Sequence, residues 1–174
     1  MLGGNRTKVA VAVALVALGG AAASASASSV GSSALESGVL TDINQVRTSH
    51  HLAPLRLSVG LGAAAREHSQ QMAADGYFAH ESHDGSAFWR RVQRFYAQGR
   101  FGYWSVGENL LWSSPDVDAA GALKMWMASP EHRANLLTPR WREIGLGAVH
   151  QTAAPGAFHG LDVTIVTTDF GIRR

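Results

Sequence analysis

Residues 126–137 of the chain read WMASPEHRANLL, and this stretch is the most informative one in the sequence. Ser129, Pro130 and Glu131 form the start signal of a helix, because a hydroxyl side chain caps free N–H groups, proline fits the first position and an acid suits the first turn. His132 then falls at the third helical position, where the positive end of the helix disfavours imidazolium and keeps a ring lone pair available. The stretch therefore predicts a short helix that holds a neutral histidine near its start.

The sequence before this stretch contains further helical patterns. Apolar side chains recur at helical spacing over residues 61–72, and Gly76 ends the pattern. His68 lies on that apolar stripe, so we interpret it as a core histidine rather than a ligand. A third helix is expected after residues 84–86, and Ser114 is expected to cap a fourth helix.

Strand patterns follow the stretch. Apolar side chains alternate in residues 144–148 and again in residues 161–165, and the intervening residues 154–156, Ala-Pro-Gly, supply turn chemistry. These two runs predict an antiparallel hairpin. Because helices come first and paired strands last, the order favours an α+β fold in which helices cover an antiparallel sheet.

Short motifs occur in a distinctive order along the chain. They are Asn44-x-x-Arg47, His68-Ser69 with Met72-Ala73, Tyr77-Phe78-Ala79-His80, Gly107-Glu108-Asn109-Leu110, Trp126-x-x-Ser129-Pro130-x-His132-Arg133-x-Asn135 and Trp141-x-x-Ile144-Gly145-x-Gly147. Each motif alone is weak, but their joint order and spacing resemble the bacterial, disulfide-free branch of the CAP superfamily. That superfamily comprises cysteine-rich secretory proteins, antigen 5 and pathogenesis-related proteins. The resemblance implies a three-layer α-β-α sandwich with a central antiparallel sheet, over residues 35–174.

The resemblance also implies a cleft lined by His80, Glu108 and His132. The nearest match to the second glutamate of eukaryotic members is Ser129, so that acid is missing. Further residues are expected to line the cleft or to brace its walls: Asn109, Ser129, Glu131, Arg133 and Asn135. Trp126 and Trp141 are expected in the core.

Three arrangements of His80, Glu108 and His132 are open at this point. Two imidazoles and a carboxylate can hold Zn²⁺ or another divalent cation, in which case Glu108 is the candidate general base for a bound water. The helix start can instead bind an anion. In the third arrangement Glu108 accepts from both imidazoles with no ligand at all. No cofactor is expected to be obligatory.

The first 27 residues have the features of a secretory signal peptide. Arg6 and Lys8 precede an apolar run over residues 9–18, and small residues follow up to Ala27. The run is shorter than the roughly 20 residues that span a bilayer, so we expect cleavage and no transmembrane segment in the mature chain. Residues 28–34 are small and polar, which predicts a flexible lead-in. The expected location is outside the cell or in its envelope.

Charge and cysteine content exclude some function classes. The 15 basic residues less Arg6 and Lys8 leave 13, which balance the 13 acidic ones, so the mature chain has no net charge and nucleic-acid binding is not expected. The chain has no cysteine, so its stability must come from packing, and it has no G-x-S-x-G elbow and no phosphate-binding loop motif. We expect a monomer.

These observations favour a secreted ligand-binding domain rather than an enzyme. The expected ligand is a lipid, a sterol or another small hydrophobic or cell-envelope component. A divalent-metal-dependent hydrolase that uses His80, Glu108 and His132 is one alternative. A structural or interaction module of a cell wall or spore coat is another.

Overall fold

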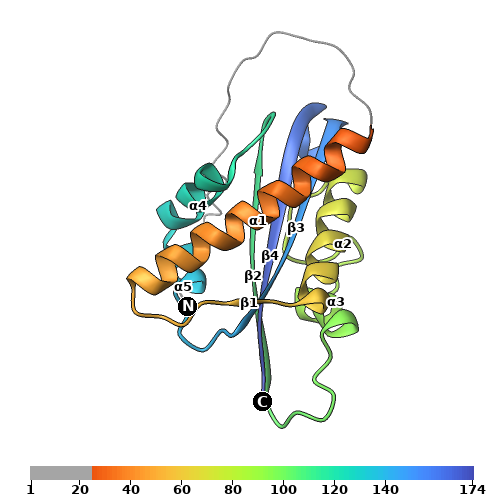
Figure 1. The fold of residues 1–174 in the computed structure, drawn as a ribbon. Helices are drawn as coiled ribbons and strands as arrows, with labels where there is room; N and C mark the ends of the chain where they lie inside the picture. Colours follow the sequence, from red (N-terminus) through yellow and green to blue (C-terminus); the bar gives the residue numbers. More distant parts are fainter. Residues whose placement is uncertain (1–24) are drawn as a thin grey trace, which may run out of the picture.

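The computed structural model describes residues 25–174, with side chains from residue 33 onward. Most of the predicted signal peptide lies outside the described residues. The elements occur in the order α1 (Ala25–Ser49), β1 (Arg56–Leu57), α2 (Val59–Asp75), α3 (Phe88–Phe95), β2 (Trp104–Ser113), α4 (Ala119–Ala128), α5 (Pro130–Leu136), β3 (Glu143–Ala154), the 3₁₀ turn η1 (Gly156–Phe158) and β4 (Leu161–Arg173) (Figure 1). None of the helices in the described part is long and apolar enough to cross a membrane.

The strands form one four-stranded sheet in the order β1-β3-β4-β2. Strands β3 and β4 form the predicted antiparallel hairpin, and β4 pairs antiparallel with β2. The sheet is mixed, because the two-residue strand β1 runs parallel to β3. Strand β2 is an edge strand, which leaves its outer side free for contacts with helices and loops.

Helices cover both faces of this sheet, which confirms the α+β sandwich. Alternate residues of a strand point to opposite faces. Leu111 and Val166 pack on the side of α1, α4 and α5, whereas Leu110 and Ile165 pack on the side of α2. Trp126 and Trp141 are buried in the first of these cores, as predicted.

Two glycines of β3 explain the close packing of α2 against the sheet. A Cβ atom on Gly145 would lie 2.0 Å from the backbone of Leu61, and one on Gly147 would lie 2.3 Å from the backbone nitrogen of Arg66. Any larger residue would therefore push the helix away. The Gly145-x-Gly147 motif is thus a packing requirement of the fold.

Asn44 and Arg47 fasten the end of α1 to the chain around it. The Asn44 side chain exchanges hydrogen bonds with the backbone of Leu55, at 2.7 and 3.1 Å. The buried guanidinium of Arg47 donates to three carbonyl oxygens, including that of Leu136 at the end of α5 at 2.7 Å. This motif is therefore structural.

Two local predictions differ from the structure. The predicted flexible lead-in, residues 28–34, is part of α1, which continues from Ala25 to Ser49. Helix α4 begins at Ala119 and not after Ser114, because Asp118 is its N-cap and accepts from the N–H of Gly121 at 2.7 Å. A carboxylate is as good a cap as a hydroxyl, and the sequence analysis did not consider Asp118.

Candidate functional site

Glu108 is the centre of the candidate site. It lies on the edge strand β2, and its carboxylate is almost completely buried on the face covered by α2 and α3. One oxygen accepts a hydrogen bond from His80 Nδ1 at 2.8 Å, and the other accepts from the guanidinium of Arg91 at 2.5 Å. Because an ionised carboxylate only accepts, His80 must carry its proton on Nδ1. The lone pair of neutral His80 is then on Nε2.

His80 belongs to the segment that connects α2 and α3. About half of its side chain is exposed, at 49%. The segment is held in place by the buried ring of His68, whose Nε2 lies 2.9 Å from the carbonyl oxygen of Ala79, and by Arg91, which donates to the carbonyl of His80. Phe88 stands edge-on to the His80 ring at 6.4 Å. These contacts fix the orientation of the His80 ring on its protein side, and the rest of the ring is exposed.

His132 reaches the site from the other side of β2. It occupies the third position of α5, as predicted, and it is half-buried. Asn109 donates to the carbonyl oxygen of His132 at 3.0 Å, and Asn135 donates to the carbonyl oxygen of Glu108 at 3.1 Å and to the side chain of Asn109 at 2.9 Å. Two asparagines therefore tie α5 to the edge strand.

The ionisation of His132 follows from its surroundings. Burial, and then the charge of His80, lower the pKa of His132, while Glu131 acts in the opposite direction. The direction agrees with the prediction of a neutral imidazole, although burial and not the helix end is its main cause. At neutral pH His132 therefore offers a neutral ring nitrogen.

Arg91 and Asp169 are the functional residues that sequence reasoning missed. Arg91 follows Arg90 in an amphipathic helix and looks like a solvent-facing charge, but it is buried against Glu108. Asp169 lies directly opposite Glu108 in the pairing of β2 with β4 and is completely buried. An acid inside the β-branched run of β4 was the available signal, because buried acids need partners.

The buried position of Asp169 favours the protonated form of its carboxyl group. Neither of its oxygens receives a hydrogen bond from a donor in the described part of the chain. Burial, and then the negative charge of Glu108, raise the pKa of Asp169 well above its usual range, against the opposing effect of Arg91. A protonated Asp169 can donate to Glu108, whereas two ionised carboxylates repel.

The remaining predicted residues have supporting or peripheral positions. Ser129 is at the N-cap of α5, but its side chain makes no capping hydrogen bond. Glu131 and Arg133 are exposed on the first turn and the middle of α5. His68 is a buried core histidine, as predicted.

The arrangement does not fit a three-ligand metal site as it stands. No group of three or more His, Cys, Asp and Glu side chains in the described part of the chain is placed to hold a metal ion. Both oxygens of Glu108 are already engaged, one by the cationic side chain of Arg91. A metal held by His80, Glu108 and His132 would have to displace these contacts, and that set of ligands stays a prediction.

Two surface hollows occur in the described part of the molecule, and one of them borders the candidate site at Arg91. One, of about 430 Å³, lies between α1 and α2 and is lined by residues including Leu40, Leu57 and Val59. The other, of about 390 Å³, lies beside α3 and is lined by residues including Arg90 and Arg94. Neither of these two hollows is lined by His80 or His132, and a cleft lined by these histidines stays a prediction.

Comparison with known proteins places this geometry in context. Residues 40–168 match the model of the cysteine-rich secretory protein family, CAP. A Bacillus subtilis protein, YkwD, is 32% identical over 117 residues, which are 67% of this chain and 43% of that protein. The membrane protein YlbC of Bacillus subtilis is 29% identical over 112 residues, 64% of this chain and 31% of that protein. The chain thus spans less than half the length of these curated relatives.

A solved structure shares the fold. An extracellular protein from Bacillus anthracis that contains an SCP domain superimposes with a TM-score of 0.68, at 23% identity. The superposition covers 89% of this chain and 45% of that one.

Proposed function

The chain belongs to the CAP family, and from this premise we propose that it is an extracellular domain that binds a cell-envelope component through His80 and His132. The observation that carries the proposal is the bond between buried Glu108 and the half-exposed ring of His80. It fixes the tautomer and orientation of the ring, so Nε2 is presented outward. A ligand hydroxyl can donate to such a nitrogen without any change in protonation.

His132 supplies the second contact of the proposed site. The pKa of His132 is lowered, so its ring is neutral at neutral pH. Two imidazole rings on either side of an edge strand suit a polar head with several hydroxyl groups. The ligand classes that remain are lipid headgroups, sterol hydroxyls and envelope glycans.

The proposal needs no chemical step. The Glu108 carboxylate is almost completely buried and accepts from both Arg91 and His80, which disfavours a role as general base for a bound water. We therefore place the hydrolase second to the binding domain.

The test is recovery of bound material. The protein is incubated with an extract of envelope lipids and, separately, with purified cell wall, and the retained compounds are identified by mass spectrometry. Retention is expected to fall at least about tenfold in His80→Asn and His132→Asn, since each loses a hydrogen bond worth about 1.4 kcal/mol or more. The control is His50→Asn, an exposed histidine at the end of α1.

The same variants separate the alternatives. Equal retention by all three variants would remove the proposed site. Zinc uptake by the parent protein in calorimetry, lost in His80→Asn and His132→Asn and accompanied by hydrolysis of an envelope substrate, would favour the metal-dependent hydrolase instead. Retention of intact cell wall without any small compound would favour the structural module.

A further inference from the structure

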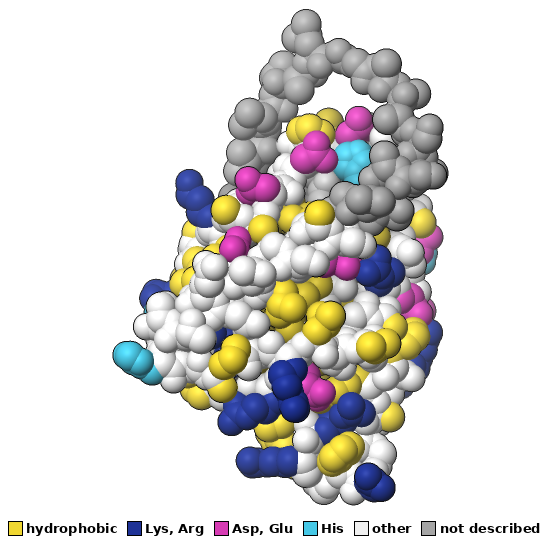
Figure 2. Space-filling view, in the orientation of Figure 1, with side chains coloured by type: hydrophobic (Ala, Val, Ile, Leu, Met, Phe, Trp, Pro, Cys, Tyr) yellow, Lys and Arg dark blue, Asp and Glu magenta, His cyan; other side chains and the backbone are white. Residues whose placement is uncertain are grey.

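One end of the molecule carries arginine and aromatic side chains that take no part in the His80 and His132 site. Figure 2 shows Lys and Arg side chains gathered at the lower end of the molecule and most Asp and Glu side chains of this view higher up. We call this surface the basic end and define it by six residues: Arg100, Phe101, Tyr103, Arg142, Arg173 and Arg174.

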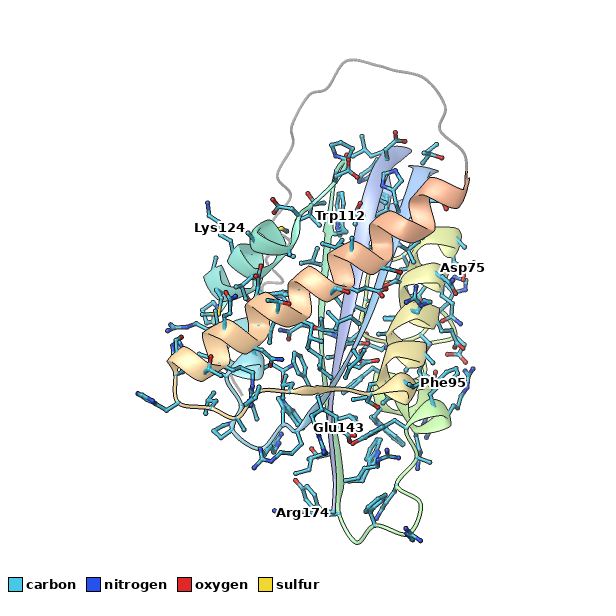
Figure 3. All side chains as sticks on the ribbon, in the orientation of Figure 1. Asp75, Phe95, Trp112, Lys124, Glu143 and Arg174 are labelled. Carbon is cyan, nitrogen blue, oxygen red and sulfur yellow. The ribbon has the colours of Figure 1, made fainter. Side chains whose placement is uncertain are left out.

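Strand pairing brings these residues together from three parts of the sequence. The N–H of Tyr103 donates to the carbonyl oxygen of Arg174 at 2.9 Å, just beyond the start of β2 and the end of β4. The N–H of Arg142 donates to the carbonyl oxygen of Gly171 at 3.1 Å, just before β3 begins. The basic end is therefore built on one end of the sheet, where β2 and β3 begin and β4 ends. Figure 3 labels Arg174 and Glu143 at this end.

The aromatic rings of the basic end are exposed beside the guanidinium groups. Phe101 is 38% exposed and Tyr103 is 40% exposed. The guanidinium of Arg173 lies 5.4 Å from the centre of the Phe101 ring, and that of Arg174 lies 5.1 Å from the centre of the Tyr103 ring. Arg173 also lies 3.8 Å from the centre of the Tyr96 ring, and one of its N–H groups donates to the carbonyl oxygen of Ala97 at 3.1 Å. A stacked guanidinium keeps the remaining N–H groups in its plane available to an anion.

One acid, Glu143, lies beside the four arginines of the basic end. None of its four arginines forms an ion pair with a carboxylate of the described chain. The nearby acid Glu143 accepts a hydrogen bond from the hydroxyl of Tyr96. The acid Asp162 lies at the other end of β4. This strand has 13 residues and is roughly 40 Å long, so Asp162 is far from the basic end. Because residues 28–174 contain 13 basic and 13 acidic residues, the basic end reflects segregation of charge and not an excess.

We propose that the basic end docks this domain on an anionic lipid bilayer. Arginines near such a surface are attracted by its negative potential, and aromatic rings settle at the level of the headgroups. A phosphate polymer would match the charge, but it gives exposed Phe101 and Tyr103 no apolar layer to enter. This inference does not depend on the proposed function, because it uses none of the residues of the His80 and His132 site.

The experiment measures binding to vesicles. The protein is purified in the form that an expressing bacterium releases, and its N-terminus is determined, because Arg6 and Lys8 would themselves bind lipid. Co-sedimentation is measured with vesicles of equal parts phosphatidylglycerol and phosphatidylcholine, and with vesicles of phosphatidylcholine alone. We expect binding to the first only, and its loss near 1 M salt, where screening acts within about 3 Å.

A matched pair of double variants locates the binding surface. Arg100→Gln with Phe101→Ser removes one cation and one exposed ring from the basic end. Lys124→Gln with Met125→Ser removes one cation and one 37% exposed apolar side chain from α4, and Lys124 lies away from the basic end in Figure 3. The first pair should weaken binding about tenfold, of which about fivefold comes from the lost charge, and the second should leave it unchanged.

Several results would overturn the proposal. These are equal binding to both kinds of vesicle, equal losses in the two double variants, and binding to soluble poly(glycerol phosphate) without binding to vesicles. The last result would assign the basic end to a phosphate polymer. Unchanged melting temperatures of both double variants would show that any loss of binding is not a loss of folding.

Discussion

Replacing His68 by glutamine is expected to remove much of the acid sensitivity of this protein. His68 is completely buried in α2, where Nε2 lies 2.9 Å from the carbonyl oxygen of Ala79 and Nδ1 lies 3.4 Å from the hydroxyl of Tyr77. Glutamine can donate to the carbonyl and accept from the hydroxyl as neutral histidine does, but it cannot gain a proton near neutral pH.

The magnitude follows from the pKa of the buried ring. Burial, opposed by the charge of Glu108 and reinforced by that of Arg91, lowers the pKa of His68 from 6.5 to about 4. Below pH 6.5 the unfolded chain binds this proton and the folded chain does not, so the stabilisation is complete above pH 6.5 and is lost as the pH falls toward 4. At about 1.4 kcal/mol per pH unit, the loss in the free energy of unfolding is about 3 kcal/mol.

Urea unfolding of the parent and of His68→Gln, between about pH 7 and about pH 4, measures this contribution. The parent should lose about 3 kcal/mol more than the variant over that range, whatever the difference between them at pH 7. His50→Gln, which changes an exposed histidine at the end of α1, should follow the parent. If the unfolding free energies of parent and His68→Gln fall in parallel, the buried ring does not control acid unfolding and the reasoning is wrong.

Three further variants test the packing and the centre of the site. Arg91→Gln removes the cation from buried Glu108 and should lower the unfolding free energy by about 3–5 kcal/mol; a loss below about 1 kcal/mol in urea unfolding would show that the pair is dispensable. Trp126→Ala empties a fully buried site and should also lower it by about 3–5 kcal/mol, and a negligible change in calorimetric melting would contradict its core position. Gly147→Ala forces α2 away from β3 and should lower it by about 1–3 kcal/mol relative to Gly102→Ala, which meets no atom within 4 Å; equal melting temperatures would refute the close approach.

The centre of the site shows where sequence reasoning reached and where it stopped. Its two histidines and Glu108 were identified from their motifs, and the structure places His80 and Glu108 in direct contact. The same motifs left the role of Glu108 open between a metal ligand, a base and a partner of both histidines. The partners of a buried carboxylate depend on the side chains that face it, and those come from α3 and β4.

The missing second acid is an instructive case. The sequence has Ser129 at the position of the second glutamate of eukaryotic members, and from this we expected a site with a single acid. The structure places Asp169 beside Glu108 from the neighbouring strand. The position of Asp169 is 61 residues from Glu108 along the chain, so no local motif joins them. Only the register of β2 with β4 brings the two carboxyl groups together.

The properties that the sequence determined by itself are those that depend on local signals. Helical and strand periodicity, the helix start signal at residues 129–131 and the order of the motifs act over a few residues at a time, so the fold class, the elements and the family are readable from the chain alone. The exceptions, at α4 and at residues 28–34, arose where neighbouring signals competed or were weak.

Tertiary structure alone decided the electrostatics of the protein. Arg91 and Asp169 are charged residues in ordinary surroundings of sequence, and they become the partners of Glu108 because helix packing and strand pairing exclude water around them. The arginines of the basic end are likewise scattered from residue 100 to residue 174, and they meet because β2 and β3 begin, and β4 ends, at the same end of the sheet. The interaction between two charges depends on the distance between them and on how deeply they are buried. Neither the distance nor the burial is defined until the chain is folded.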